Sequence, residues 1–484
     1  MIRPFNPFFG DAGEPGQRRR GKAGLWVLRR VDLLLLFPGL LALLFRPARA
    51  EGPPISFSLS LAVGRSPIAV ALTDLNRDGN ADLAVANNES DSLSVFYGSG
   101  PANFLPAVAV AVGAAPTALG SADLNHDLRP DLLVSSGIDD VVMSLLSLPP
   151  DRLERGVEFP TGTGPAGLAM PDINRDNHAD LIVSNAFDGT ISVFLGEEGG
   201  SFRTLGDFVS GAGIDSGPLG VAAGDFNRDE HVDVLVANQL EDTVTVFFGD
   251  GSGAFQDVRT FDVDSLPTAA RFGDATGDGL TDIVTVNEGS DTVVILAGDG
   301  AGGVGNRLTL ETGGFPESVA VRDLNGDGLA DIVTADSFSD VVSVFASRGE
   351  GQFEERAVFP VGRSPFDLVI GDLNADGKLD LVTANLDDDT ISILLNTTAF
   401  SVAHGDVDGD ADVDGADLAS QVDEVFDGDG DITSQVHRGF RGSVETADAN
   451  VDGFINAADL VALQRQIARA RASRRRVDAH RVRF

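Results

Sequence analysis

A short run of oxygen-bearing side chains recurs along the sequence, and its spacing suits a hard metal ion. In "DLNGDGLAD", residues 323–331, acidic or amide side chains stand at positions 1, 3, 5 and 9, with glycine at position 6. Ca²⁺ prefers about six to eight oxygen ligands, and alternate residues of a tight turn can direct their oxygens to one centre. Asp, Asn and Gly also dominate ordinary turns, so one copy would be weak evidence. The number of copies therefore decides the interpretation.

The run occurs seven times, and its first Asp recurs at intervals of 49, 49, 53, 49, 49 and 49 residues. Seven copies at one place in a repeat favour calcium, with positions 1, 3, 5 and 9 supplying side chains and position 7 a backbone carbonyl. The predicted ligands are Asp74, Asn76, Asp78 and Asp82; Asp123, Asn125, Asp127 and Asp131; Asp172, Asn174, Asp176 and Asp180; Asp225, Asn227, Asp229 and Asp233; Asp274, Thr276, Asp278 and Asp282; Asp323, Asn325, Asp327 and Asp331; and Asp372, Asn374, Asp376 and Asp380.

Position 6 lies at the sharp bend of the loop and differs among the copies. Glycine occupies it in four copies, and Leu128, Asn177 and Glu230 occupy it in the second, third and fourth. Asparagine tolerates a left-handed backbone, so we expect the third loop to function. Leu128, which has Pro130 nearby, and Glu230 suit the bend poorly. We expect the second and fourth loops to be the weakest sites.

The residues around each loop predict four short strands per repeat of about 49 residues. A Pro-led apolar strand precedes the loop, a second strand follows it, and a polar turn and a glycine-rich turn introduce two more. This pattern is typical of one blade of a β-propeller, and seven copies predict an all-β, seven-bladed fold. Residues 56–64 resemble an isolated fourth strand, which we expect to complete the last blade and close the ring. The alternative, an open solenoid, would leave sheet edges exposed at both ends.

The seven units resemble the FG-GAP/VCBS repeats of integrin-α-type propellers over residues 55–397. The resemblance implies that the loops hold calcium and stiffen the blades, whereas ligands bind to other loops on a face of the disk. It does not identify the ligand, because this fold occurs in adhesion proteins, lectins and enzymes.

A second type of acidic loop follows the repeats. The stretches at 405–418 and 447–460 each fit a twelve-residue EF-hand loop with an acid at position 12. The predicted ligands are Asp406, Asp408, Asp410 and Asp417, and Asp448, Asn450, Asp452 and Asp459. Ala411 stands where glycine is preferred, so we expect the first loop to bind more weakly. A solvated acidic linker, the alternative, would not account for the apolar residue at position 8 and the leucine at position 13 in both copies.

These paired units resemble a type I dockerin over residues 404–470, which implies a cohesin-like partner and paired EF-hand helices. Positions 10 and 11, which contribute to recognition in that family, are Gly415 with Ala416 and Ala457 with Ala458 instead of hydroxyl residues. We therefore do not expect a standard cellulosomal cohesin, and intramolecular or cell-surface docking remains open. The basic tail at 471–484 could contact the acidic propeller or an anionic envelope, although such tails are commonly just solvated.

The charge distribution and the N-terminal sequence pattern limit where the protein can be located and which partners it can bind. Residues 51–464 carry 18 basic and 70 acidic side chains, a formal net charge of −52, which disfavours nucleic acid and anionic lipid and favours cations. Basic residues at 18–30, an apolar run at 33–45 and "ARA" at 48–50 predict a signal peptide at 1–50, hence an extracellular or envelope protein. The apolar run is too short for a membrane anchor. The chain has no cysteine, so disulfides are excluded.

No pattern of catalytic residues stands out. His126, His178 and His231 fall at variable loop positions, and a carboxylate pair cannot be selected among 74 acidic residues. One tyrosine, Tyr97, and one tryptophan, in the predicted signal, also leave few aromatic platforms for sugars. We favour an exported calcium-binding propeller that binds a protein or a glycan. The alternative is an extracellular polysaccharide hydrolase or lyase carried by the dockerin-like module.

Overall fold

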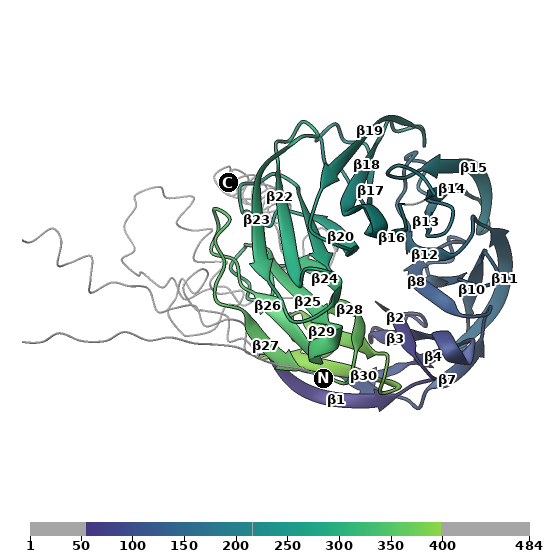
Figure 1. Cartoon of the computed structure of the whole chain (residues 1–484). Coiled ribbons are helices and arrows are strands. Elements are labelled where there is room, and N and C mark those ends of the chain that lie inside the picture. The colour runs from purple at the N-terminus through teal and green to yellow at the C-terminus, as the bar shows by residue number, and fades with distance from the viewer. Residues whose placement is uncertain (1–54, 215, 398–484) are drawn as a thin grey trace, which may run out of the picture. The chain divides into compact units, whose positions relative to one another are not determined.

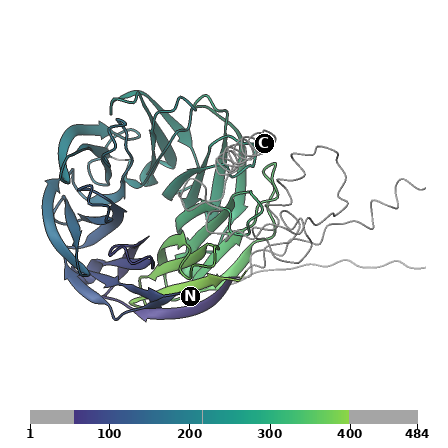
Figure 2. The ribbon, with the colours of Figure 1, turned by 180° about the vertical axis from the view of Figure 1, so that it is seen from behind.

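The computed structural model describes residues 55–214 and 216–397, whose elements are all β-strands and short 3₁₀ turns. Seven four-stranded antiparallel sheets surround one hub, as Figure 1 shows and as Figure 2 shows from behind. The predicted seven-bladed all-β propeller is confirmed. The predicted signal peptide (1–50), the dockerin-like module with its ligands from Asp406 to Asp459, and the basic tail lie outside the described residues.

Each blade runs outward from an innermost strand, and we number the blades in chain order. Blade one contains β2 (Pro67–Thr73), β3 (Asp82–Asn87), β4 (Ser92–Phe96) and β7 (Val108–Ala111). Blade two contains β8 (Pro116–Ala122), β9 (Asp131–Ser136), β10 (Val141–Leu148) and β11 (Arg152–Pro160). Blade three contains β12 (Pro165–Ala169), β13 (Leu181–Asn185), β14 (Thr190–Glu197) and β15 (Ser201–Val209).

The remaining blades follow the same order. Blade four contains β16 (Pro218–Gly224), β17 (Asp233–Asn238), β18 (Thr243–Gly249) and β19 (Phe255–Asp262). Blade five contains β20 (Pro267–Gly273), β21 (Asp282–Asn287), β22 (Thr292–Gly298) and β23 (Val304–Glu311). Blade six contains β24 (Pro316–Arg322), β25 (Asp331–Asp336), β26 (Val341–Phe345) and β27 (Ala357–Pro360). Blade seven contains β28 (Pro365–Gly371), β29 (Asp380–Asn385), β30 (Thr390–Asn396) and β1 (Ile55–Ala62).

The N-terminal strand closes the ring. β1 pairs antiparallel with β30, with Ile55 opposite Asn396 and Ala62 opposite Thr390. The last blade is therefore built from both ends of the repeat array, as the sequence predicted. Closure pairs the outer edge of β30, which an open array would leave exposed.

Burial is greatest in the second strand of each blade and least in the fourth. All six residues of β25 are buried, whereas most residues of β23 and β11 are exposed. Valine, leucine and isoleucine fill the second and third strands and pack against the neighbouring blades, so seven hydrophobic clusters lie between successive sheets. The core is thus a ring of inter-blade layers.

Aspartates at the end of the turn between strands two and three join successive blades. The carboxylate of Asp291 accepts a hydrogen bond from the Phe315 amide at 2.9 Å, and that of Asp389 accepts one from the Ser66 amide at 2.9 Å. The same contact recurs from Asp91, Asp140, Asp242 and Asp340. These aspartates have left-handed backbones. The Asp389 contact joins blade seven to blade one.

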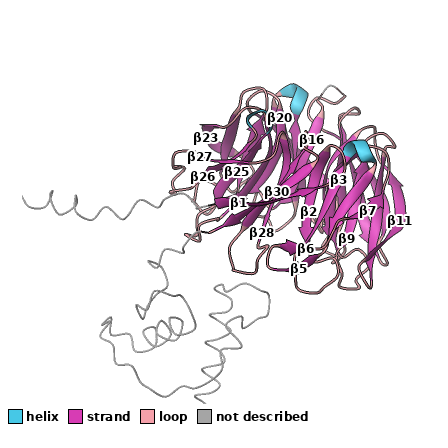
Figure 3. Ribbon diagram, turned by 90° about the horizontal axis from the view of Figure 1, so that it is seen from below, coloured by secondary structure: helices cyan, strands magenta, loops and turns pink. Residues whose placement is uncertain are grey.

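The two faces of the disk carry different connections between strands, and Figure 3 shows the disk edge-on. The loop face carries the seven acidic loops between strands one and two, and the ribbon of β5 (Gly98–Gly100) and β6 (Asn103–Phe104). The turn face carries the turns between strands two and three, including η1 (Asn88–Ser90), η2 (Gln239–Glu241) and η3 (Ser337–Ser339). Within the described residues, no helix has the length and apolar character needed to span a membrane.

Candidate functional sites

The acidic loop of blade six shows how its side chains are held. Oδ1 and Oδ2 of Asp323 accept hydrogen bonds from the amides of Asp327 (3.3 Å) and Gly328 (2.8 Å). Oδ1 of Asn325 accepts from the same Asp327 amide at 2.9 Å, and Oδ1 of Asp327 accepts from the Leu329 amide at 2.9 Å. Oxygens from positions 1 and 3 therefore converge on one nitrogen. Hydrogen bonds to backbone amides therefore hold these side-chain oxygens in place, and no bound ion is needed for this.

The bonds made by positions 1 and 5 recur in all seven loops, including the two with unfavourable residues at position 6. Leu128 has φ of 71° and Glu230 has φ of 70°, against 84° for Gly328. The sequence led us to expect poor loops here. The structure instead keeps the loop conformation and places both side chains in a strained backbone region.

Position 4 is also left-handed in every loop, which the sequence analysis did not anticipate. The residues there are Arg77, His126, Arg175, Arg228, Gly277, Gly326 and Ala375. The glycines at 277 and 326 were the available signal for this requirement.

Position 9 differs from the other predicted ligands because it is fully buried. Asp331 has no exposed surface, and its two oxygens accept hydrogen bonds from the amides of Leu324 (3.0 Å) and Ser347 (2.8 Å). The equivalent aspartates of the other six loops also bind two amides each. Burial raises the pKa of Asp331 to about 6. These carboxylates join the acidic loop to the end of strand three.

The oxygens of each loop are of the chemical type that a hard cation takes, but the side chains of one loop are not gathered around a single centre. Within residues 55–214 and 216–397, no group of three or more Asp, Glu or His side chains is placed to hold a metal. Each loop instead presents the carboxylates of positions 1 and 5, usually with the amide of position 3. The position 9 oxygens each accept one bond and retain a second lone pair. In the fifth loop Thr276 replaces asparagine, and its buried hydroxyl makes no hydrogen bond.

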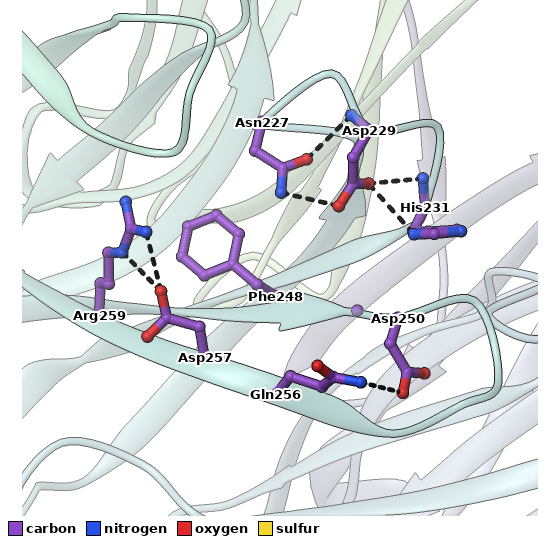
Figure 4. A pocket seen from close by; sticks show the side chains of 9 residues that line it. Asn227, Asp229, His231, Phe248, Asp250, Gln256, Asp257 and Arg259 are labelled. Atoms are coloured by element: carbon purple, nitrogen blue, oxygen red, sulfur yellow. Dashed lines mark hydrogen bonds and ion pairs between the residues drawn. The ribbon is translucent and has the colours of Figure 1, made fainter.

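A cavity of about 330 Å³ adjoins the acidic loop of blade four (Figure 4). Asp229 and His231 line one wall, and the turn between β18 and β19 lines the other. Arg259 lies 4.8 Å from the Phe248 ring centroid, and its Nε donates to Asp257 at 2.8 Å. Because Phe248 is only 5% exposed, it offers no ring face for stacking a sugar. Carboxylate and amide side chains line the cavity together with Phe248, His231 and Arg259.

Two of the predicted incidental histidines meet across adjacent loops. Nε2 of His126 lies 2.7 Å from Nδ1 of His178, and the rings are edge to face. His231 instead lies beside Asp229, with its Nδ1 3.5 Å from Oδ1. Tyr97 is buried in the core between blades one and two. The three described histidines therefore lie on the loop face.

The turn face carries apolar side chains at corresponding repeat positions. We call Ile138, Phe187, Leu240, Phe315 and Phe338 the apolar crescent; all five are exposed, Phe338 by 76%. Four of them occupy the turn between strands two and three, and Phe315 precedes β24. Phe315 and Phe338 pack edge to face with centroids 5.5 Å apart. Contiguous exposed apolar surface favours contact with another molecule, and within the crescent Phe315 and Phe338 are the pair shown to touch.

Comparisons with known proteins agree with this architecture. The family described as FG-GAP-like repeat matches residues 74–134, 172–236, 226–285, 274–334 and 323–383, more than half of the chain. A comparison with curated proteins found no match. The crystal structure of BBS1N in complex with ARL6DN, soaked with lead, is similar with a TM-score of 0.53 and 14% identity, covering 71% of this chain and 97% of that one.

A second solved structure, of a protein from Lactobacillus plantarum, gives a TM-score of 0.50 at 14% identity and covers 63% of this chain and 88% of that one. At these identities the likeness supports the fold alone. The sequence match adds that all seven acidic loops lie within repeat segments.

Proposed function

The chain belongs to the family of proteins with FG-GAP-like repeats, and on that premise we propose that it is an exported calcium-binding propeller that binds a protein ligand. Its turn face would be the binding surface, and its acidic loops would hold calcium as part of the scaffold. The observation that carries the proposal is the contrast between the apolar crescent on one face and the acidic loops on the other. A β-propeller of this family is a fold of the binding-module type.

Calcium would be held by the side chains at positions 1, 3 and 5 of each loop, the carbonyl of position 7 and the free lone pairs of position 9. In blade six these are Asp323, Asn325, Asp327 and Asp331, with the carbonyl of Leu329. A bound cation would offset the repulsion between two carboxylates held a few residues apart. It would also rigidify the connection between strands one and two.

The crescent favours a protein over a glycan as the ligand. Its members are phenylalanine, leucine and isoleucine, which remove apolar surface from water on binding and offer no hydrogen bonds to hydroxyl groups. The carboxylates of Asp291 and Asp340 fix the chain segments beside Phe315 and Phe338 through hydrogen bonds to the amides of Phe315 and Ser364. The crescent is therefore presented on an ordered backbone.

Export and attachment complete the proposal. The predicted signal peptide at 1–50 would direct the chain outside the cytoplasm, and the dockerin-like module at 404–470 would attach it to a cohesin-like or cell-surface partner. The crescent would remain available for the ligand, because attachment would use a separate module. The protein would act in adhesion or binding at the bacterial surface or outside the cell.

The test is affinity capture from envelope and culture fluid with the chain from residue 51, in Ca²⁺ buffer. We expect the double variant Phe315→Ser, Phe338→Ser to lose the captured protein. The matched control is Leu128→Ser, which removes a side chain on the loop face that is 66% exposed. Equal capture by the wild type and the double variant would contradict the crescent as the binding surface. Capture of a glycan in place of a protein would contradict the ligand class.

A further inference from the structure

Neighbouring acidic loops touch through side chains that do not hold the loops in shape. Positions 1 and 5 accept the recurring hydrogen bonds within a loop, whereas positions 4 and 7 carry side chains that reach the next blade. Nη2 of Arg228, at position 4 of blade four, donates to the Gly279 carbonyl of blade five at 3.0 Å. Nη1 of Arg129, at position 7 of blade two, donates to the Asn76 carbonyl of blade one at 2.8 Å. Side chains from two blades therefore meet at these junctions.

The junction between blades two and three brings two histidines together. His126 occupies position 4 of blade two and His178 occupies position 7 of blade three, and their facing nitrogens, Nε2 and Nδ1, lie 2.7 Å apart. The ring centroids are 4.6 Å apart and the rings are inclined at 76°. Because the nitrogens are much closer than the centroids, the rings converge on these two atoms. His126 is the one histidine at position 4 in the seven loops, so the sequence offers this pair at a single junction.

The outer nitrogen of each ring is free to carry the proton. Within residues 55–214 and 216–397, Nδ1 of His126 and Nε2 of His178 make no hydrogen bond to protein. A neutral imidazole carries one proton, which either nitrogen can hold. With both protons on the outer nitrogens, two lone pairs face each other across the junction. A cation that accepts both lone pairs stabilises this arrangement and takes the place of the shared proton.

The separation of the two nitrogens indicates which class of ion fits. A metal about 2.1 Å from each nitrogen sets the nitrogens about 3.0 Å apart at a right angle and about 3.4 Å apart at the tetrahedral angle. The observed 2.7 Å is closer to the right-angled value. Right-angled neighbours are typical of tetragonal Cu²⁺ and Ni²⁺, and both ions take imidazole ligands. Ca²⁺ takes oxygen ligands, so the pair is chemically distinct from the acidic loops around it.

Water has access to the pair. His126 is exposed and His178 is half-buried. Oδ1 of Asp176 accepts a hydrogen bond from the His178 amide at 2.9 Å, which fixes the backbone of one of the two histidines. Since the described residues hold no group of three His, Asp or Glu side chains placed for a metal, the protein supplies two ligands here. Water completes the coordination of a bound ion.

We propose that His126 and His178 form a binding site for a late first-row divalent ion, Cu²⁺ or Ni²⁺, at the junction of blades two and three. The ion joins the two blades through side chains on the loop face. Its water ligands leave positions that a donor atom of another molecule can take. The site goes beyond the proposed function, which assigns calcium to the loop oxygens and a protein ligand to the crescent.

The test is isothermal titration calorimetry of the untagged chain from residue 51 with Cu²⁺, Ni²⁺ and Zn²⁺ in separate experiments, in buffer with excess Ca²⁺ and no chelator. Excess Ca²⁺ keeps the transition ions out of the acidic loops. The variants are His126→Arg and His178→Asn, because the repeat itself carries arginine and asparagine at these positions in blade one. We expect each variant to bind Cu²⁺ at this site at least tenfold more weakly. The histidines at 404, 437 and 480 are unchanged in every variant, so the comparison isolates the pair.

His231→Asn is the matched control. His231 occupies position 7 of blade four, but the preceding blade carries Arg175 at position 4, so His231 has no histidine opposite it. This variant should bind Cu²⁺ like the wild type. Electron paramagnetic resonance of the Cu²⁺-loaded wild type should show coupling to two imidazole nitrogens, and each pair variant should lose one of them.

A pair that serves only as a hydrogen bond predicts a different result. It requires both variants to lower the melting temperature in metal-free buffer and neither to change Cu²⁺ binding. Our proposal requires Cu²⁺ to raise the melting temperature of the wild type and of His231→Asn, but not of the two pair variants. Equal Cu²⁺ binding by the wild type and both pair variants overturns it, as does an equally large loss in His231→Asn. Tighter binding of Zn²⁺ than of Cu²⁺ overturns the right-angled geometry and with it the class of ion.

Discussion

The seven acidic loops and the seven inner strands belong to the same repeats and both vary in sequence, but the loops keep one set of hydrogen bonds throughout. The loops keep their hydrogen bonds even where Leu128 or Glu230 stands in a left-handed conformation. The inner strands, by contrast, exchange small residues for Arg271, Arg322 and Asp367 in adjacent blades. Uniformity under strain is expected of a scaffold.

Because the acidic loops are uniform, we expect them to contribute chiefly to the stability of the fold. Removing Ca²⁺ with excess EDTA should lower the melting temperature by at least about 10 °C, because a ligand at 100 times its dissociation constant contributes about 2.7 kcal/mol per site and several loops would act together. Differential scanning calorimetry of the chain from residue 51 measures this effect. Re-addition of Ca²⁺ should restore the melt. An unchanged transition in EDTA would show that the loops hold their shape without calcium.

Within a loop, the buried and exposed carboxylates should differ in EDTA. Asp331→Ala leaves the amides of Leu324 and Ser347 without their acceptor, and we expect a loss of about 3 to 5 kcal/mol in the free energy of unfolding. Asp327→Ala, in the exposed part of the same loop, should cost about 1 kcal/mol or less. Urea denaturation of both variants gives the two values. Equal losses would refute the separate structural role of position 9.

The sequence predicted the blades well because one aspartate per repeat marks the same point of the fold. It could not show that Asp331 lies inside, since a motif read along the chain does not report which oxygens accept amide hydrogen bonds. It also missed the meeting of His126 with His178, which depends on the spacing of adjacent blades. Val70 and Asp367 are 297 residues apart, and only the closed ring lets the Val70 amide donate a hydrogen bond to the Asp367 carboxylate at 3.0 Å. Local patterns therefore predicted elements, while contacts between repeats required the closed fold.

Glu317, at the turn-face end of β24, should make the stability of the fold depend on pH. Burial and the charge of Glu288 raise the pKa of Glu317 to about 7. Because the folded pKa lies above the unfolded value of about 4.3, the native state binds this proton more tightly, so the contribution of Glu317 to stability falls between about pH 4.5 and 7. Glu317→Gln should therefore raise the free energy of unfolding by about 1 to 2 kcal/mol at pH 8, allowing for solvent contact, and leave it unchanged at pH 4.

Chemical denaturation at the two pH values measures the Glu317 effect. Glu198→Gln, which changes an exposed glutamate, serves as the control and should have little effect at either pH. A gain for Glu317→Gln that is as large at pH 4 as at pH 8 would mean that the substitution acts through packing and not through charge.

The smallest expected effect concerns backbone strain, and it tests the uniformity of the loops most directly. Leu128→Gly should stabilise the chain by about 0.5 to 1 kcal/mol, because the left-handed backbone penalty exceeds the added entropy of glycine in the unfolded state. Gly328→Leu makes the reverse change in blade six, where a Cβ would meet no atom within 4 Å. It should therefore destabilise by a similar amount without a steric clash. Thermal melts of both variants in EDTA measure the two changes in stability. The proposal requires these changes to have opposite signs. If both substitutions destabilise, the Leu128 side chain contributes contacts that outweigh its strained backbone, and position 6 is not equivalent in the two loops.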